Sequence, residues 1–79
     1  MTIPRDVSGE RLADVLCRKW QYRRVHLVGS HIILETSEPM HQRIAVPAHR
    51  SLRVGTLNSI LRSVAGHKGI AREQIIDTL

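Results

Sequence analysis

Three short β-prone segments lie close together in the middle of this chain, at residues 22–28, 31–35 and 41–46. Gly29 and Ser30 form the first break between them, and the turn-rich stretch TSEPM, residues 36–40, forms the second. Pro47 ends the third segment because proline has no backbone N–H to donate to a ladder. The pattern predicts a three-stranded antiparallel meander, and the flanking segments must supply whatever covers it.

Helical patterns lie on both sides of the meander. Residues 9–19 follow Ser8, a residue type that caps helices, and carry an apolar stripe that ends at Trp20. From Thr56, apolar residues recur at i, i+3, i+4 and i+7, and Gly66 is the expected left-handed end of this second helix. A short last helix is expected over residues 72–78. Cys17 flanks the first stripe and is interpreted as a small packing residue.

The element order is therefore α-β-β-β-α with a short final helix, which predicts an α+β fold in one domain, residues 1–79. A chain of this length buries only about 60% of the surface of its unfolded form. The helices can cover one face of the sheet, and the other face stays open to solvent or to a partner. This is the topology of the double-stranded-RNA-binding type of fold, although topology alone does not determine function.

Charge narrows the class of partner. Twelve Lys and Arg residues against seven Asp and Glu residues give a net charge of +5, and ten of the twelve are arginine. No acidic residue lies between Pro39 and Arg72. Because the planar guanidinium pairs with phosphate through two hydrogen bonds, nucleic acid is the favoured partner. A basic surface that only keeps the protein in solution is the alternative.

Strand alternation predicts which side chains occupy the open face. If Ile32 and Leu34 point to the helices, then His31, Ile33 and Glu35 point away from them. The same argument turns three residues of the third segment outward. The open face is then expected to bring together His31, His41 and Arg43.

His31 is the candidate for proton transfer, because an imidazole changes charge near neutral pH. Gly29 and Ser30 precede it and leave room for a ligand to approach the backbone. The alternative is a structural histidine, hydrogen-bonded at the start of a strand. Ser30 and His31 are unsuited to act as nucleophile and base, because neighbours on a strand point to opposite faces.

Other kinds of site find little support. The five histidines show no His-x3-His spacing and Cys17 is the only cysteine, so neither a metal site nor a cofactor is predicted. The N-terminus MTIPRDVSGE has no apolar signal segment, and no apolar run is long enough to span a bilayer. A cytoplasmic protein without a membrane contact is expected.

Taken together, several motifs resemble the HicA toxin family, the small mRNA interferases of bacterial type II toxin–antitoxin pairs. They are the first helix ending at Trp20, GSH at residues 29–31, VPAH at residues 46–49, VGTLNSIL at residues 54–61 and AGHKGIAREQIIDTL at the end of the chain. The resemblance implies a fold of the double-stranded-RNA-binding type and ribosome-independent cleavage of mRNA. It also implies an antitoxin of the HicB family that covers the active site, and it assigns the catalytic role to His31.

The residues themselves suggest which groups would hold RNA. The candidates for phosphate contacts are Lys19, Arg24, Arg43 and Arg53, with Gly29 and Ser30 beside the histidine. Two other functions stay open. One is an RNA-binding module of the same fold without catalysis, and the other is a pure protein-interaction partner that uses Ile33 and its neighbours as an interface.

Overall fold

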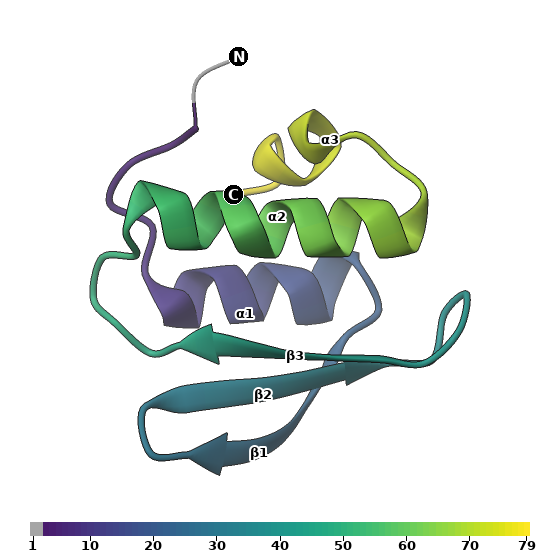
Figure 1. Ribbon diagram of the computed structural model, residues 1–79, viewed down its shortest axis with the longest axis horizontal. Helices are drawn as coiled ribbons and strands as arrows, with labels where there is room; N and C mark the ends of the chain where they lie inside the picture. The colour runs from purple at the N-terminus through teal and green to yellow at the C-terminus, as the bar shows by residue number, and fades with distance from the viewer. Residues whose placement is uncertain (1–2) are drawn as a thin grey trace.

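The structure, a computed structural model, describes residues 3–79. Its elements follow the predicted order and confirm the α+β fold (Figure 1). Helix α1 spans Gly9–Lys19, strands β1, β2 and β3 span Arg23–Val28, His31–Thr36 and Gln42–Pro47, and helices α2 and α3 span Val54–Lys68 and Arg72–Ile76. The strands form one antiparallel sheet in the order β1-β2-β3. Within residues 3–79, no helix is both long and apolar enough to cross a membrane.

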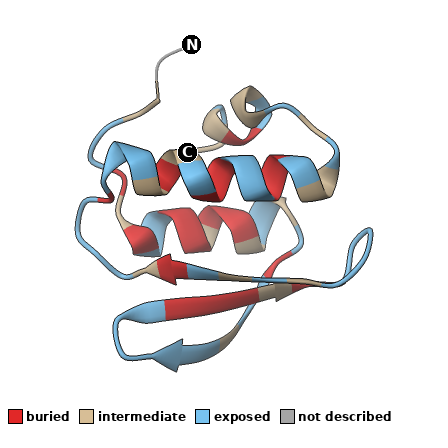
Figure 2. Cartoon of the chain, viewed as in Figure 1, coloured by how far each residue is buried: buried red, intermediate tan, exposed pale blue. Residues whose placement is uncertain are grey.

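The core lies between one face of the sheet and the two long helices. Ile32, Leu34 and Val46 supply its sheet side and are almost fully buried (Figure 2). The helices contribute the stripes that the periodicity predicted, and α3 adds Ile75; the helical core residues are Leu12, Ala13, Leu16, Leu57, Ile60, Leu61, Val64, Ala65 and Ile75. Since α1 and α2 both contact this face, the opposite face of the sheet carries no helix among the described residues.

Helix α2 is longer than predicted at both ends. It continues through Gly66, and the left-handed residue that ends it is Gly69, with φ 69°. Gly66 lies inside the helix, with helical residues on both sides, and is exposed. It therefore forms no turn that would require glycine. The expectation that Gly66 ends the helix is therefore wrong.

Helix α1 approaches the end of β3 at backbone distance. The N–H of Gly9 donates to the carbonyl of His49 over 2.9 Å. A Cβ built on Gly9 would lie 1.8 Å from the carbonyl oxygen of Pro47, which is far inside van der Waals contact. Only glycine fits here, and this contact joins the start of α1 to the segment that leaves the sheet.

At the opposite end of the sheet, a polar cluster fastens the β2–β3 connection to the last turn of α2. The ammonium of Lys68 donates to Thr36 Oγ1 over 2.9 Å and to the carbonyl of Glu38 over 2.6 Å, and lies 4.7 Å from the centre of the Tyr22 ring. The Tyr22 hydroxyl donates to Gln42. Burial raises the pKa of Tyr22 to about 12, and burial also lowers the pKa of Lys68, against the opposing charge of Glu38.

The Gly9 contact predicts that Gly9→Ala destabilises the protein by about 1–3 kcal/mol, because the added methyl group has no room beside a backbone carbonyl. Gly66→Ala is the matched control. Nothing lies within 4 Å of a Cβ at Gly66, so alanine should stabilise α2 by about 0.5–1 kcal/mol. Urea unfolding of both variants measures the two effects, and equal changes of the same sign would contradict the close approach.

The buried Tyr22 predicts a loss of stability in strong alkali. Its folded-state pKa of about 12 lies above the ordinary value of 10.0, so burial of the neutral phenol contributes full stability below pH 10. That contribution disappears as the pH rises from 10 to about 12. Tyr22 is the only tyrosine, so the absorbance of tyrosinate reports on it alone. If the absorbance titration of the folded protein had its midpoint at the ordinary tyrosine pKa, the Tyr22 ring would be exposed.

Candidate nucleic-acid interface on the open face of the sheet

His31 begins β2, immediately after the turn that joins β1 to β2. Gly29 has φ 59°, which suits a two-residue hairpin turn, and Val28 pairs with His31 across it. On the other side His31 pairs with Pro47, the last residue of β3. Since Ile32 points into the core, alternation turns His31 to the open face, where it is exposed as predicted.

The imidazole of His31 has no hydrogen-bond or ion-pair partner among residues 3–79, and neither do the exposed rings of His26 and His49. Two other histidines are held: His67 Nε2 lies 2.7 Å from the carbonyl oxygen of Met40, and His41 Nε2 lies 3.4 Å from Glu35 Oε1. Among residues 3–79, no hydrogen bond or ion pair involves the His31 ring. Both ring nitrogens are therefore available to a ligand, and the ligand or the backbone must orient the ring.

Several segments that are distant in sequence meet around this end of the sheet. The N–H of Ala48 donates to the carbonyl of Ser30 over 2.6 Å, which brings the start of the β3–α2 connection beside the turn. The start of α1 joins them through the contact between Gly9 and His49 (Figure 1). The connection carries Arg50 and then Arg53, the residue that precedes α2. The connection itself therefore carries two arginines and no acidic residue, and its Ser51 donates to the carboxylate of Asp6.

The structure places only some of the predicted phosphate ligands near His31. Gly29 and Ser30 are adjacent to it and exposed, whereas Arg53 is exposed at the far end of the β3–α2 connection, directly before α2 in the helix layer (Figure 1). Lys19 ends α1, about 15 Å along the helix from the end that meets β3. Arg43 shares the open face but lies opposite Glu35, about 13 Å along β2 from His31. The expectation that His31, His41 and Arg43 come together is thus met only in the sense of a shared face.

Arg24 lies on the helix side of the sheet, because β1 contains a bulge. Counting back from the turn, an unbroken ladder would pair Arg24 with Glu35. The register shifts between Arg24 and His26, so Arg24 pairs with Leu34 and Arg23 with Glu35. The guanidinium of Arg24 contacts both carboxylate oxygens of Glu10 at 3.2 Å. It is thereby held on the face away from His31.

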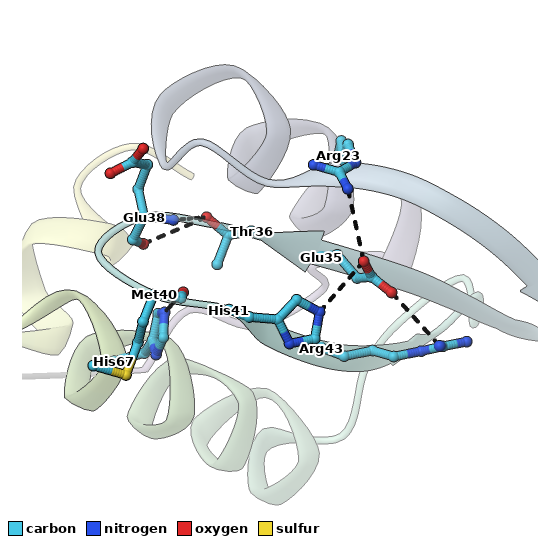
Figure 3. A network of polar contacts seen from close by, with 8 residues as sticks. All are labelled: Arg23, Glu35, Thr36, Glu38, Met40, His41, Arg43 and His67. Atoms are coloured by element: carbon cyan, nitrogen blue, oxygen red, sulfur yellow. Dashed lines mark hydrogen bonds and ion pairs between the residues drawn. The ribbon is translucent and has the colours of Figure 1, made fainter.

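Glu35 is the centre of a charge cluster that the sequence did not reveal (Figure 3). Its carboxylate lies 3.8 Å from Arg23 Nη2, 3.4 Å from His41 Nε2 and 3.5 Å from Arg43 Nη1. The Glu35 side chain is only 17% exposed, whereas its partners are largely exposed. Alternation had placed Glu35 on the open face, but its pairing with Arg23 depends on a bulge that no residue pattern announces.

Ile33 lies between these two ends of β2, opposite His26 and Ala45. It faces away from the helices, as predicted, and does not belong to the core cluster. Neighbouring side chains leave it only 9% exposed, so it cannot serve as the exposed apolar centre of a protein interface. A hollow of about 290 Å³ lies beside β1, between Glu10 and Leu27, and His31 does not line it.

The Glu35 cluster predicts that Glu35→Gln lowers stability by about 1 kcal/mol, because Arg23 and Arg43 lose their shared anion and His41 loses its carboxylate partner. The loss should shrink at high salt, which screens the remaining repulsion. Glu38→Gln is the control and should lose less stability, since its hydrogen bonds are through its backbone and its exposed carboxylate acts on one cation, Lys68. Thermal unfolding at two salt concentrations measures both, and a Glu35 variant as stable as the control would contradict the cluster.

Comparison with known proteins adds no relative: no family model, no curated protein and no solved structure matches this chain. Among residues 3–79, no three His, Cys, Asp or Glu side chains lie together as metal ligands would. The site is therefore defined by its own geometry, which is an exposed, unpartnered imidazole at one end of a helix-free sheet face and a charge cluster at the other.

Proposed function

We propose that the protein is a ribosome-independent endoribonuclease, an mRNA interferase of the toxin–antitoxin kind, with His31 as its single catalytic histidine. The observation that carries the proposal is the free imidazole of His31 on the helix-free face of the sheet, in a chain of net charge +5. Basic residues of the β3–α2 connection lie at the same end of the molecule. The resemblance of the GSH, VPAH and VGTLNSIL motifs to the HicA family supports the same function.

The protein need not supply a nucleophile, because RNA carries its own, the 2′-hydroxyl. Attack of that oxygen on the adjacent phosphorus forms one P–O bond and breaks the bond to the leaving 5′-oxygen. His31 accelerates this step by accepting the 2′ proton or by protonating the leaving oxygen. One such group typically contributes about 10²–10⁴-fold, and nearby cations stabilise the negative charge on the phosphorane. The reaction proposed here uses neither a metal ion nor a small-molecule cofactor.

The proposed function implies a cytoplasmic location and an antitoxin as protein partner. A toxin that cleaves mRNA acts in the cytoplasm, and a HicB-type antitoxin would restrain it by covering the open face. A cover on this face would block access to His31 without entering the core, since both long helices lie on the other side of the sheet.

A second function, RNA binding without cleavage, is favoured by one observation. The His31 ring has no orienting partner among residues 3–79, whereas catalytic bases are commonly held by a third group. Both functions need the same basic surface, so an assay of cleavage, and not of binding, separates them.

We expect His31→Gln to abolish cleavage of a long RNA in the presence of a chelator, while the variant keeps the stability and the RNA affinity of the wild type. His31 is exposed and does not belong to the core cluster, so its replacement should leave the fold intact. His67→Gln is the matched control, because His67 contacts Met40 at the far end of the sheet, and it should cleave normally. Full cleavage by His31→Gln removes this histidine from the mechanism, and no cleavage by wild type favours the binding module.

A further inference from the structure

The open face carries a second charged site that has no part in the proton transfer at His31. Arg23 of β1 and Arg43 of β3 flank Glu35 of β2, and both reach its carboxylate. The two arginines contribute +2 and Glu35 contributes −1, so the cluster keeps at least one positive charge, and His41 adds to it when protonated. The cluster can therefore take up an anion.

Glu35 holds the guanidinium groups of Arg23 and Arg43 in position by charge, but it forms no hydrogen bond with either of them. The ion-pair distances of 3.8 Å and 3.5 Å are longer than the 2.7–2.9 Å typical of a charge-assisted hydrogen bond. The side chains of Arg23 and Arg43 are 65% and 51% exposed. Each guanidinium has N–H donors in a planar fork, and among residues 3–79 none of the Arg23 or Arg43 donors makes a hydrogen bond, so solvent can reach them.

Other arginines of the chain show the contrast. Arg24 is hydrogen-bonded to both oxygens of Glu10 at 3.2 Å, and Arg18 Nε donates to Asp14 over 3.1 Å. Arg24 Nη1 and Arg18 Nε are thus each committed to a carboxylate, and Arg18, although 74% exposed, lies on α1, away from the open face. Arg23 and Arg43 are thus held in position with their hydrogen-bonding capacity largely free, as a phosphate-binding site requires.

The position of the cluster relative to His31 indicates how a strand would lie. Glu35 is four residues after His31 on β2, which corresponds to about 13 Å along the strand. This span is longer than one nucleotide, so a phosphate at the cluster and the scissile phosphate at His31 must belong to different nucleotides. Between the two, the exposed Ala45 and His26 flank the shielded Ile33, and this row carries no Arg, Lys, Asp or Glu beside the intervening sugar and base.

We propose that Arg23 and Arg43, positioned by Glu35, form a phosphate-binding clamp that holds single-stranded RNA along β2, away from the nucleotide that is cleaved at His31. This inference rests on the proposed function and names the part of the substrate that the cleavage site does not contact. Its ligand is the RNA backbone, so it contributes affinity and positioning without sequence preference.

The test measures the affinity of a single-stranded RNA oligonucleotide in the His31→Gln background, where no cleavage interferes. Arg23→Gln/Arg43→Gln should weaken binding at least tenfold, and the slope of log affinity against log salt should fall by about 0.7 for each phosphate released. The matched control, Arg18→Gln/Arg62→Gln, removes two charges from exposed positions on α1 and α2 and should change affinity far less. Equal losses in the two double variants would overturn the clamp, because net charge alone would then explain binding.

A lysine double variant and the cleavage assay of the wild type make the binding comparison easier to interpret. Arg23→Lys/Arg43→Lys retains the charge and loses the fork, so it should restore the salt slope but only part of the affinity. If the glutamine double variant does not fold, the affinity of the lysine double variant still shows whether the two guanidinium groups contribute to RNA binding. Failure of the clamp is distinct from failure of the proposed function: a wild type that never cleaves RNA refutes the nuclease, while the binding comparison still decides the clamp.

Discussion

Packing of α1 and α2 against the same face of a three-stranded sheet is the constraint on which the rest of this structure depends. Ile32, Leu34 and Val46 bury their side chains against the helical stripes, and the alternation of β2 then sends His31, Ile33 and Glu35 the other way. The elements formed by residues 3–79 leave that second face uncovered. The open face is thus a direct consequence of the small core.

The two ends of this face are built differently. At the His31 end, backbone contacts dominate. Gly9 contacts the end of β3, and the N–H of Ala48 donates to Ser30. These contacts hold the β1–β2 turn and the start of α1 in place, while the His31 imidazole makes no such contact. At the Glu35 end, one shielded carboxylate gathers exposed cations. A long anionic strand that contacts both ends would be held by charge at one and left accessible to proton transfer at the other.

The helix side of the sheet shows why a basic composition alone is a weak guide to a binding site. Arg24 and Arg18 are as basic as Arg23 and Arg43, but their guanidinium groups are hydrogen-bonded to Glu10 and Asp14. The bulge in β1 decides which arginine of the Arg23–Arg24 pair faces which side. A shift of one residue decides whether a guanidinium group pairs with Glu10 on the helix side or joins the cluster around Glu35 on the open face.

The sequence by itself determined the order of elements, the bounds of α1, the core stripes and the exposed position of His31, because these follow from local periodicity, capping and alternation within one strand. Only the tertiary structure decided the partners of Glu35, the separation of Arg43 from His31, the retreat of Arg24 to the helix side and the demand for glycine at position 9. Each of these depends on register between strands or on the distance between segments far apart in the chain. Such relations arise when hydrogen-bonded ladders and close packing form, so residue patterns within one segment do not contain them.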